Sequence, residues 1–244
     1  MFLIVLFFII AAVYASAGFG GGSSYLAVMA LCGVGVETMK PTALLCNIVV
    51  VIGGTYIFWK NGNLDFKKVI PLSIWSIPLA FLGGKLKLEE KTFFLLLGFG
   101  LIVAAVFMLL PKKQADNAVE ESKPNWIVSS SLGGGIGFFS GVVGIGGGIF
   151  LSPILNLLKW DLPKNIAAAA SFFILVNSVA GLLGQLSKNA ALDWAFVLPL
   201  MAAVLVGGQI GSRFNALKMN QRHVQQVTAL LVLYAGVNIL WNHL

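Results

Sequence analysis

The sequence has few charged residues for its length. Only 10% of its 244 residues are Asp, Glu, Lys or Arg, whereas 58% are hydrophobic and the mean hydropathy is +0.92. A soluble globular domain carries about 25% charged residues, and a soluble core of this size could not bury so much apolar surface. The composition therefore excludes a soluble domain and predicts an integral membrane protein with many spans.

Acidic side chains are scarce, and they avoid the apolar segments. All nine Asp and Glu residues lie outside the predicted spans, in the polar linker or in loops, among them Glu37, Asp65, Glu89, Glu90, Asp161 and Asp193. Hydrolysis or phosphoryl transfer needs an acid–base or metal constellation, and the predicted spans contain no His, Asp or Glu set that could form one. The sequence therefore predicts that the protein is not an enzyme, and it gives no sign of a buried proton relay.

Cysteine and nucleic-acid signals are also missing. The two cysteines, Cys32 and Cys46, lie in apolar segments without the spacing of a metal motif, so no metal site is predicted. The net charge of +7 comes from short loops and has no accompanying aromatic stripe. This pattern fits contact with anionic headgroups of a lipid bilayer better than contact with nucleic acid.

Glycine, in contrast, is abundant and occurs in two matching clusters. Gly18-Phe19-Gly20-Gly21-Gly22 and Gly144-Ile145-Gly146-Gly147-Gly148 lie about 126 residues apart, each inside a long apolar stretch. Such clusters break a helix, and lipid tolerates a break only where protein or a water-lined cavity covers it. Matched breaks in two halves of a membrane protein indicate a central binding site.

A nucleotide-binding interpretation of these clusters fails. No βαβ pattern surrounds them, and no Gly-Lys-Ser or Gly-Lys-Thr follows. The sequence therefore predicts no bound cofactor.

The apolar segments fall into two similar halves. We expect a first transmembrane repeat over residues 1–110, a polar linker over 111–125 and a second repeat over 126–244. The apolar segments lie near 1–17, 20–35, 41–59, 67–83 and 92–110, and then near 126–143, 147–159, 164–186, 194–211 and 223–242. The expected fold is an all-α polytopic membrane protein, in which each half has a glycine-broken or re-entrant helix pair followed by three transmembrane helices.

Other short motifs recur at nearly the same offset as the glycines. The matches are Lys40-Pro41-Thr42-Ala43 with Lys164-Asn165-Ile166-Ala167, Asn47 with Ser171, Leu64-Asp65-Phe66 with Leu192-Asp193-Trp194, Pro71 with Pro199, and Gly83-Gly84-Lys85-Leu86 with Gly211-Ser212-Arg213-Phe214. Five ordered matches indicate an internal duplication.

Loop charges bear on the orientation of the two repeats. If each half crosses the membrane an odd number of times, the repeats are inverted. One face then carries five of the 16 Lys and Arg residues, namely Lys40, Lys85, Lys87, Lys91 and Lys188, and the other face carries the rest. If each glycine-broken pair is one bent span, the repeats are parallel and the charges divide almost evenly. The positive-inside rule favours inversion with both termini outside.

The candidate site begins at the two glycine clusters. A new helix is expected after each break, at about Ser23 and Ile149, and a helix N-terminus binds anions through free N–H groups without a basic side chain. The candidate binding residues here are Gly20, Gly21, Gly22, Ser23, Ser24, Gly146, Gly147 and Gly148. The alternative is that these glycines only permit close helix packing.

Three polar side chains within the predicted spans complete the candidate site. Asn47 and Ser171 are included because they match between the repeats, and Asn177 lies further along the span that contains Ser171. A polar side chain in lipid must find a partner. For Asn177 the alternative is an interhelical hydrogen bond.

The glycine clusters and the Gly-Ser-Arg-Phe end of a late helix resemble the TauE/SafE sulfite exporter family over essentially the whole chain. The resemblance implies a multi-pass protein of a prokaryotic plasma membrane that moves sulfite, sulfonates or related small sulfur-containing anions. At Ala170-Ser171, where a Thr-Ser pair is common in the family, Ala170 replaces the Thr. One hydroxyl expected near the ligand is therefore missing.

These observations together favour a secondary transporter that exports a small sulfur-containing anion, bound between the two glycine clusters near the membrane midplane. An anion channel, or a transporter of a different small organic anion, remains the alternative.

Overall fold

The computed structural model describes residues 1–16, 18–109, 126–187, 192–214 and 221–244. Every regular element in these ranges is a helix. Within these described ranges, six stretches are long and apolar enough to cross a membrane, namely Val36–Lys60, Phe66–Lys85, Glu90–Leu109, Trp126–Val143, Pro163–Leu186 and Trp194–Arg213. The prediction of an all-α polytopic membrane protein is therefore confirmed. The predicted linker, 111–125, lies outside the described residues.

The helices of the two halves follow the same order. Before the undescribed linker come α1 (Phe2–Ser16), α2 (Gly22–Leu31), α3 (Val36–Lys60), α4 (Phe66–Ser73), α5 (Ser76–Lys85) and α6 (Glu90–Leu109). After it come α7 (Trp126–Val143), α8 (Gly148–Leu157), α9 (Pro163–Leu186), α10 (Trp194–Phe214) and α11 (Gln221–His243). The short α4 and α5 occupy the place that the continuous α10 occupies in the second half.

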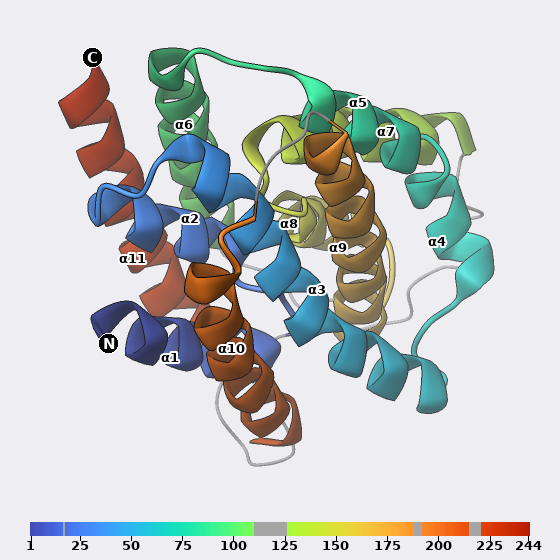
Figure 1. The fold of residues 1–244 in the computed structure, drawn as a ribbon. Coiled ribbons are helices and arrows are strands. Elements are labelled where there is room, and N and C mark those ends of the chain that lie inside the picture. The colour runs from blue at the N-terminus through green and yellow to red at the C-terminus, as the bar shows by residue number, and fades with distance from the viewer. Residues whose placement is uncertain (17, 110–125, 188–191, 215–220) are drawn as a thin grey trace.

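The long helices α3 and α9 pack against each other near the middle of the molecule (Figure 1). They run in opposite directions, because Leu44 of α3 lies beside Gly181 whereas Thr55, eleven residues later, lies beside Ser171. The Thr55 and Ser171 hydroxyls share a hydrogen bond of 2.9 Å. This bond joins the two halves inside the protein.

Glycine stripes bring neighbouring helices into close contact. In α7 a glycine recurs every fourth residue, and these glycines lie directly on the backbone of α4 and α5, in the pairs Gly133 with Leu72, Gly137 with Ser76 and Gly141 with Ala80. In α10, Gly207 and Gly211 lie on Phe8 and Ala12 of α1 in the same way. Small residues at this spacing allow van der Waals packing, the main attraction between helices in lipid.

The helices of each half pack against equivalent positions in the other half. The first helix of each half packs in parallel against the fourth segment of the other, α1 on α10 and α7 on α4 and α5. The last helices, α6 and α11, are antiparallel, because Gly98 lies beside Leu240 and Ile102 lies beside Gly236. This pattern supports the prediction of inverted repeats.

Candidate functional site

The two glycine clusters form loops with left-handed backbone. We call residues 18–22 the first glycine loop and residues 144–148 the second glycine loop. Gly21 and Gly147 precede α2 and α8 with φ angles of 90° and 84°, a region that side chains other than glycine seldom adopt. The helices begin at Gly22 and Gly148, each one residue before the predicted start. The predicted helix breaks are therefore confirmed.

The two loops reach the centre of α3 from opposite ends. A methyl group on Gly18 would lie 3.1 Å from the ring of Phe58, near the end of α3, whereas one on Gly144 would lie 3.4 Å from the side chain of Lys40, near its start. These contacts are separated by about 27 Å along the helix, at 1.5 Å per residue. Between them, both loops contact Asn47.

Asn47 fills the space between the loop tips. Its side-chain nitrogen donates a hydrogen bond of 2.9 Å to the carbonyl oxygen of Ile145 in the second loop. A methyl group on Gly20 or Gly22 would overlap the Asn47 amide, and one on Gly146 would lie 2.8 Å from its nitrogen. The side chain is only 1% exposed. In this conformation the loops therefore close directly on Asn47 and on each other, instead of leaving a gap for an anion.

Two helix N-termini converge on this point. The first backbone bond of α2 runs from Tyr25 N–H to the Gly21 carbonyl, and that of α8 runs from Phe150 N–H to the Gly147 carbonyl. The N–H groups that precede these bonds have no partner within their helices. Both helix ends also carry a partial positive charge, so the arrangement suits a negatively charged ligand.

Several buried polar atoms around the loops have no hydrogen-bond partner among the described residues. They are Oδ1 of Asn47, the Tyr25 hydroxyl, Oγ of Ser140 and Oγ of Ser178. A methyl group on Gly146 would lie 2.8 Å from the Ser178 hydroxyl, and the Ser140 carbonyl accepts bonds from the second loop. A buried polar atom left unpaired costs about 1–3 kcal/mol. The Ser140 and Ser178 hydroxyls, which can donate hydrogen bonds beside the second loop, add to the capacity of the site to bind an anion.

The predicted residues Ser23 and Ser24 lie in the first turn of α2, but their hydroxyls face α1. Ser24 shares a hydrogen bond of 2.7 Å with the Tyr14 hydroxyl, and Ser23 lies 3.5 Å from the same oxygen. These contacts tie α2 back to α1. Their backbone N–H groups, rather than their hydroxyls, are therefore the groups available to a ligand.

The sequence match between Asn47 and Ser171 differs from the spatial one. Gly148 lies against Ile174 as Gly22 lies against Asn47, so Ile174 occupies the position equivalent to Asn47. The sequence offset between matched motifs varies by a few residues, so Ser171 lies three residues before the true counterpart of Asn47. Three residues turn a side chain through most of one helical turn. Ser171 instead bonds to Thr55. The interpretation of Asn47 and Ser171 as a symmetric pair was therefore wrong.

Asn177 is fully buried in α9 and bonds within its own helix. Its side-chain nitrogen donates to the Phe173 carbonyl at 2.8 Å, and its Oδ1 has no partner in the described ranges. The bond that forms is therefore within α9, not the interhelical bond considered as the alternative for Asn177. The neighbouring Ser178, rather than Asn177, touches the second loop.

Sequence reasoning overlooked Ser140, Tyr14 and Lys40 as members of this region. The loop-charge pattern places Lys40 in a loop, but the residue lies inside α3 and is buried. The available signal was its spacing: Lys40 precedes Asn47 by seven residues, two helical turns, so both lie on the same face of α3.

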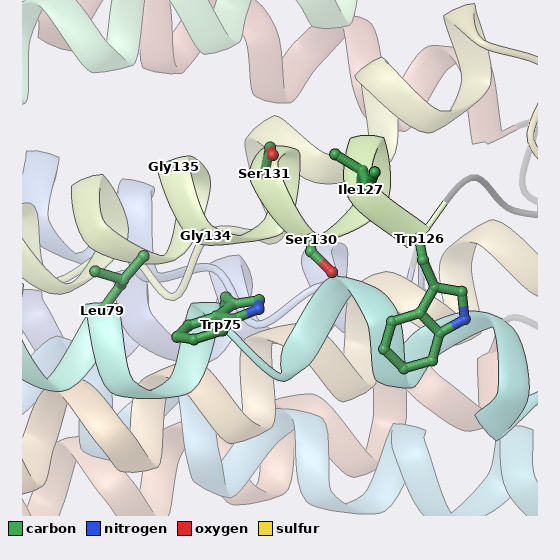
Figure 2. Close-up of a pocket in the computed structure, with 8 residues that line it drawn as sticks. All are labelled: Trp75, Leu79, Trp126, Ile127, Ser130, Ser131, Gly134 and Gly135. Atoms are coloured by element: carbon green, nitrogen blue, oxygen red, sulfur yellow. The ribbon is translucent and has the colours of Figure 1, made fainter.

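A separate cavity of about 500 Å³ lies between α5 and α7 (Figure 2). It includes no residue of either glycine loop, and Trp75 and Trp126 at its edges are exposed. Its lining carries no charged group: Trp75, Leu79, Trp126, Ile127, Ser130, Ser131, Gly134 and Gly135. This cavity is therefore distinct from the polar centre at Asn47.

An ion pair joins the segment after α8 to the start of α4. Lys68 Nζ lies 2.7 Å from Asp161 Oδ2. Burial acts to raise the pKa of Asp161, but hydrogen bonds from Lys68, the Leu162 N–H and Asn165, together with the Lys68 charge, outweigh it and lower the pKa below the ordinary value. The pair thus favours the ionised carboxylate.

Comparison with known proteins supports a transport role. The profile of the family described as "Sulfite exporter TauE/SafE" matches residues 3–239. The probable membrane transporter protein y4hK of Sinorhizobium fredii is 34% identical over 98% of this chain and 97% of its own length.

More distant relatives carry similar names. The probable membrane transporter protein MJ0441 of Methanocaldococcus jannaschii is 23% identical over 98% of this chain and 94% of its own length. The probable membrane transporter protein YunE of Bacillus subtilis is 22% identical over 82% of this chain and 80% of its own length. No solved structure matches the chain significantly. The breadth of the family match, together with the spanning helices, shows that this multi-pass membrane protein belongs to the TauE/SafE sulfite exporter family of membrane transporters.

Proposed function

We propose that this protein is a secondary transporter that exports a small sulfur-containing anion, such as sulfite or an organosulfonate, across a prokaryotic plasma membrane. The observation that carries the proposal is the convergence of the N-termini of α2 and α8 on Asn47. Backbone N–H groups and helix dipoles bind an anion oxygen well, and the family description names sulfite. The proposed function requires no catalytic group.

The binding step follows from the hydrogen bond between Asn47 and Ile145. The same Asn47 N–H that now donates to a carbonyl oxygen could donate to an oxygen of the substrate. Binding would then separate the second loop from Asn47, and the N–H groups at the starts of α2 and α8 would complete the anion's coordination. The groups proposed to bind the substrate are therefore the Asn47 amide and the backbone of Gly20, Gly21, Gly22, Ser23, Ser24, Gly146, Gly147 and Gly148. Ser171 and Asn177, which bond to Thr55 and to the Phe173 carbonyl, remain predicted members of the set.

The proposed transport movement depends on inverted repeats. The antiparallel packing of α3 on α9 and of α6 on α11 supports this topology. Each loop then lies at the tip of a hairpin that enters from its own face of the membrane. Rocking one half against the other would expose the shared centre to the two faces in turn.

The energy of export can come from the membrane potential. When an anion leaves a negative-inside cell, the membrane potential lowers its free energy by about 2.3 kcal/mol per charge per 100 mV. Uniport of a monovalent sulfonate therefore needs neither a coupling ion nor a nucleotide.

Flux measurements on the purified protein in liposomes test this proposal. We expect saturable movement of sulfite and methanesulfonate, accelerated by the same anion on the opposite side, with protein-free liposomes as the control. Counterflow of this kind distinguishes a transporter from a channel, which would instead give single-channel currents. Absence of flux for sulfite, methanesulfonate and thiosulfate would refute the proposed function.

A further inference from the structure

A lysine is buried beside the second glycine loop. Lys40 lies in the second turn of α3 and is only 5% exposed. A methyl group on Gly144 would lie 3.4–3.5 Å from the Cα, Cβ and Cγ atoms of Lys40. Its ammonium lies 5.5 Å from the centre of the buried Phe93 ring of α6. Ionisable side chains within a membrane protein are costly, and they usually mark a substrate or ion pathway.

Lys40 and Asn47 lie at the two ends of one stretch of the second glycine loop. The second glycine loop runs along α3 with Gly144 beside Lys40 and Gly146 beside Asn47. A cation and an amide donor thus lie two helical turns apart on one face of α3, with the loop backbone between them. An anion that passes along this face would meet the positive charge before it meets the helix N-termini, or on leaving them.

The equivalent face of α9 lacks both groups. Gly18 lies beside Ala167 as Gly144 lies beside Lys40, and Gly148 lies beside Ile174 as Gly22 lies beside Asn47. On α9 the two glycine loops therefore pack closely against an alanine and an isoleucine. The packing of a glycine loop on its helix therefore does not require a lysine, and the cation beside the second loop is a feature of α3 alone.

We propose that Lys40 binds the charge of the transported anion and selects for its net charge. This inference rests on the proposed function and refines its substrate class. The Lys40 ammonium attracts a simple anion such as sulfite or methanesulfonate and so strengthens its binding. A zwitterionic sulfonate such as taurine brings its own ammonium close to that of Lys40, and the two repel. The site therefore prefers sulfonates without an amino group.

Methanesulfonate flux into liposomes tests the role of Lys40. Removing a charged partner from an anion costs about tenfold or more in affinity, so Lys40→Met should raise KM by at least that factor. Lys40→Arg keeps the charge and should retain a KM near that of the unmodified protein. Lys164→Met is the matched control, because Lys164 is the sequence counterpart in the other half and is exposed. This control should leave KM unchanged.

Competition by taurine gives a second readout that a merely structural role would not change. Taurine should compete weakly with methanesulfonate in the unmodified protein, and this preference should shrink in Lys40→Met. If Lys40→Met does not fold, as judged by size-exclusion chromatography, Lys40→Gln replaces it in both assays. An unchanged KM and an unchanged preference in a folded variant would overturn the role of Lys40 while the transport function stands. Absence of flux for every anion in the unmodified protein would overturn the proposed function, and the role of Lys40 with it.

Discussion

The side-chain nitrogen of Asn47 donates a hydrogen bond of 2.9 Å to the backbone carbonyl of Ile145, 98 residues further along the chain. The bond connects the central helix α3 to the tip of the loop contributed by the other half. Because a carbonyl oxygen and a substrate oxygen are both acceptors, a ligand can take over this donor without rearranging α3. The bond thus links closure of the loops to occupancy of the proposed site.

Replacing Asn47 should affect substrate affinity according to the charge that is introduced. Asn47→Ala removes one donor and should raise KM for sulfite by about tenfold, the effect of one hydrogen bond to a charged group. Asn47→Asp places a carboxylate between the loops and should abolish measurable flux, because like charges repel in a buried site. The matched control is Asn242→Asp, since Asn242 is an exposed amide near the end of α11. Equal flux in Asn47→Asp and Asn242→Asp would remove Asn47 from the site.

Adding one methyl group to a glycine loop should disrupt the closed centre. Gly22 has ordinary helical backbone, so Gly22→Ala tests only steric overlap, with Asn47 and the Ile145 carbonyl. Gly146→Ala also suffers from its φ of 87° at a cost of about 1–2 kcal/mol. Both variants should lose most flux and melt at a lower temperature. Gly135→Ala in α7 is the control, because a methyl group there meets no atom within 4 Å. This control should be neutral, or stabilising by about 0.5–1 kcal/mol. Full activity in Gly22→Ala would contradict the tight packing at Asn47.

The sequence predicted the glycine breaks well because the clusters encode backbone geometry directly. Gly21 and Gly147 have positive φ angles, and Gly20, Gly22 and Gly146 have no room for a Cβ atom. These are local requirements that glycine alone satisfies, so the pattern locates both loops to within one residue. The helical class and the spans follow from apolar composition for the same reason.

The environment of side chains could not be predicted in the same way, because it depends on register between distant helices. Ser171 matched Asn47 in the linear comparison, yet packing rotates it toward Thr55 and brings Ile174 to the equivalent position. The sequence pattern places Lys40 in a loop because it lies only four residues after the start of α3. Its burial arises from Gly144 and Phe93, which are 104 and 53 positions away in the sequence.

Two equivalent helix ends provide a direct test of inverted topology. Cys32 follows α2 and Leu158 follows α8, and both are exposed. In inverted repeats these positions lie on opposite faces of the membrane, whereas in parallel repeats they share a face. We expect a membrane-impermeant maleimide to label Cys32 in intact cells, since the charge bias places that face outside.

The second position is probed with Leu158→Cys in a Cys32→Ser background, and it should react only after the cells are permeabilised. Cys46 is buried in α3 and serves as the internal negative control, so the Cys32→Ser variant alone should remain unlabelled. Labelling of both positions from the same side would show parallel repeats. Labelling of Leu158→Cys from outside and of Cys32 only after permeabilisation would reverse the orientation and leave the inversion intact.

The ion pair between Lys68 and Asp161 should make stability depend on pH in a specific window. The folded protein holds the pKa of Asp161 below its ordinary value of 3.8, so protonation is less favourable in the folded than in the unfolded state. The stabilisation is therefore fully present above about pH 5 and is lost as the pH falls through the ordinary value and below it.

Asp161→Asn should lower the melting temperature by about 2–4 °C at pH 7, the shift expected for about 1 kcal/mol in a chain of this size. The difference from the unmodified protein should shrink steadily below about pH 4. Lys68→Met should show a similar loss at pH 7, whereas Lys67→Met, at an exposed neighbour, should not. A deficit in Asp161→Asn that stays constant down to pH 3 would mean that its partners stabilise the side chain through packing rather than through its charge.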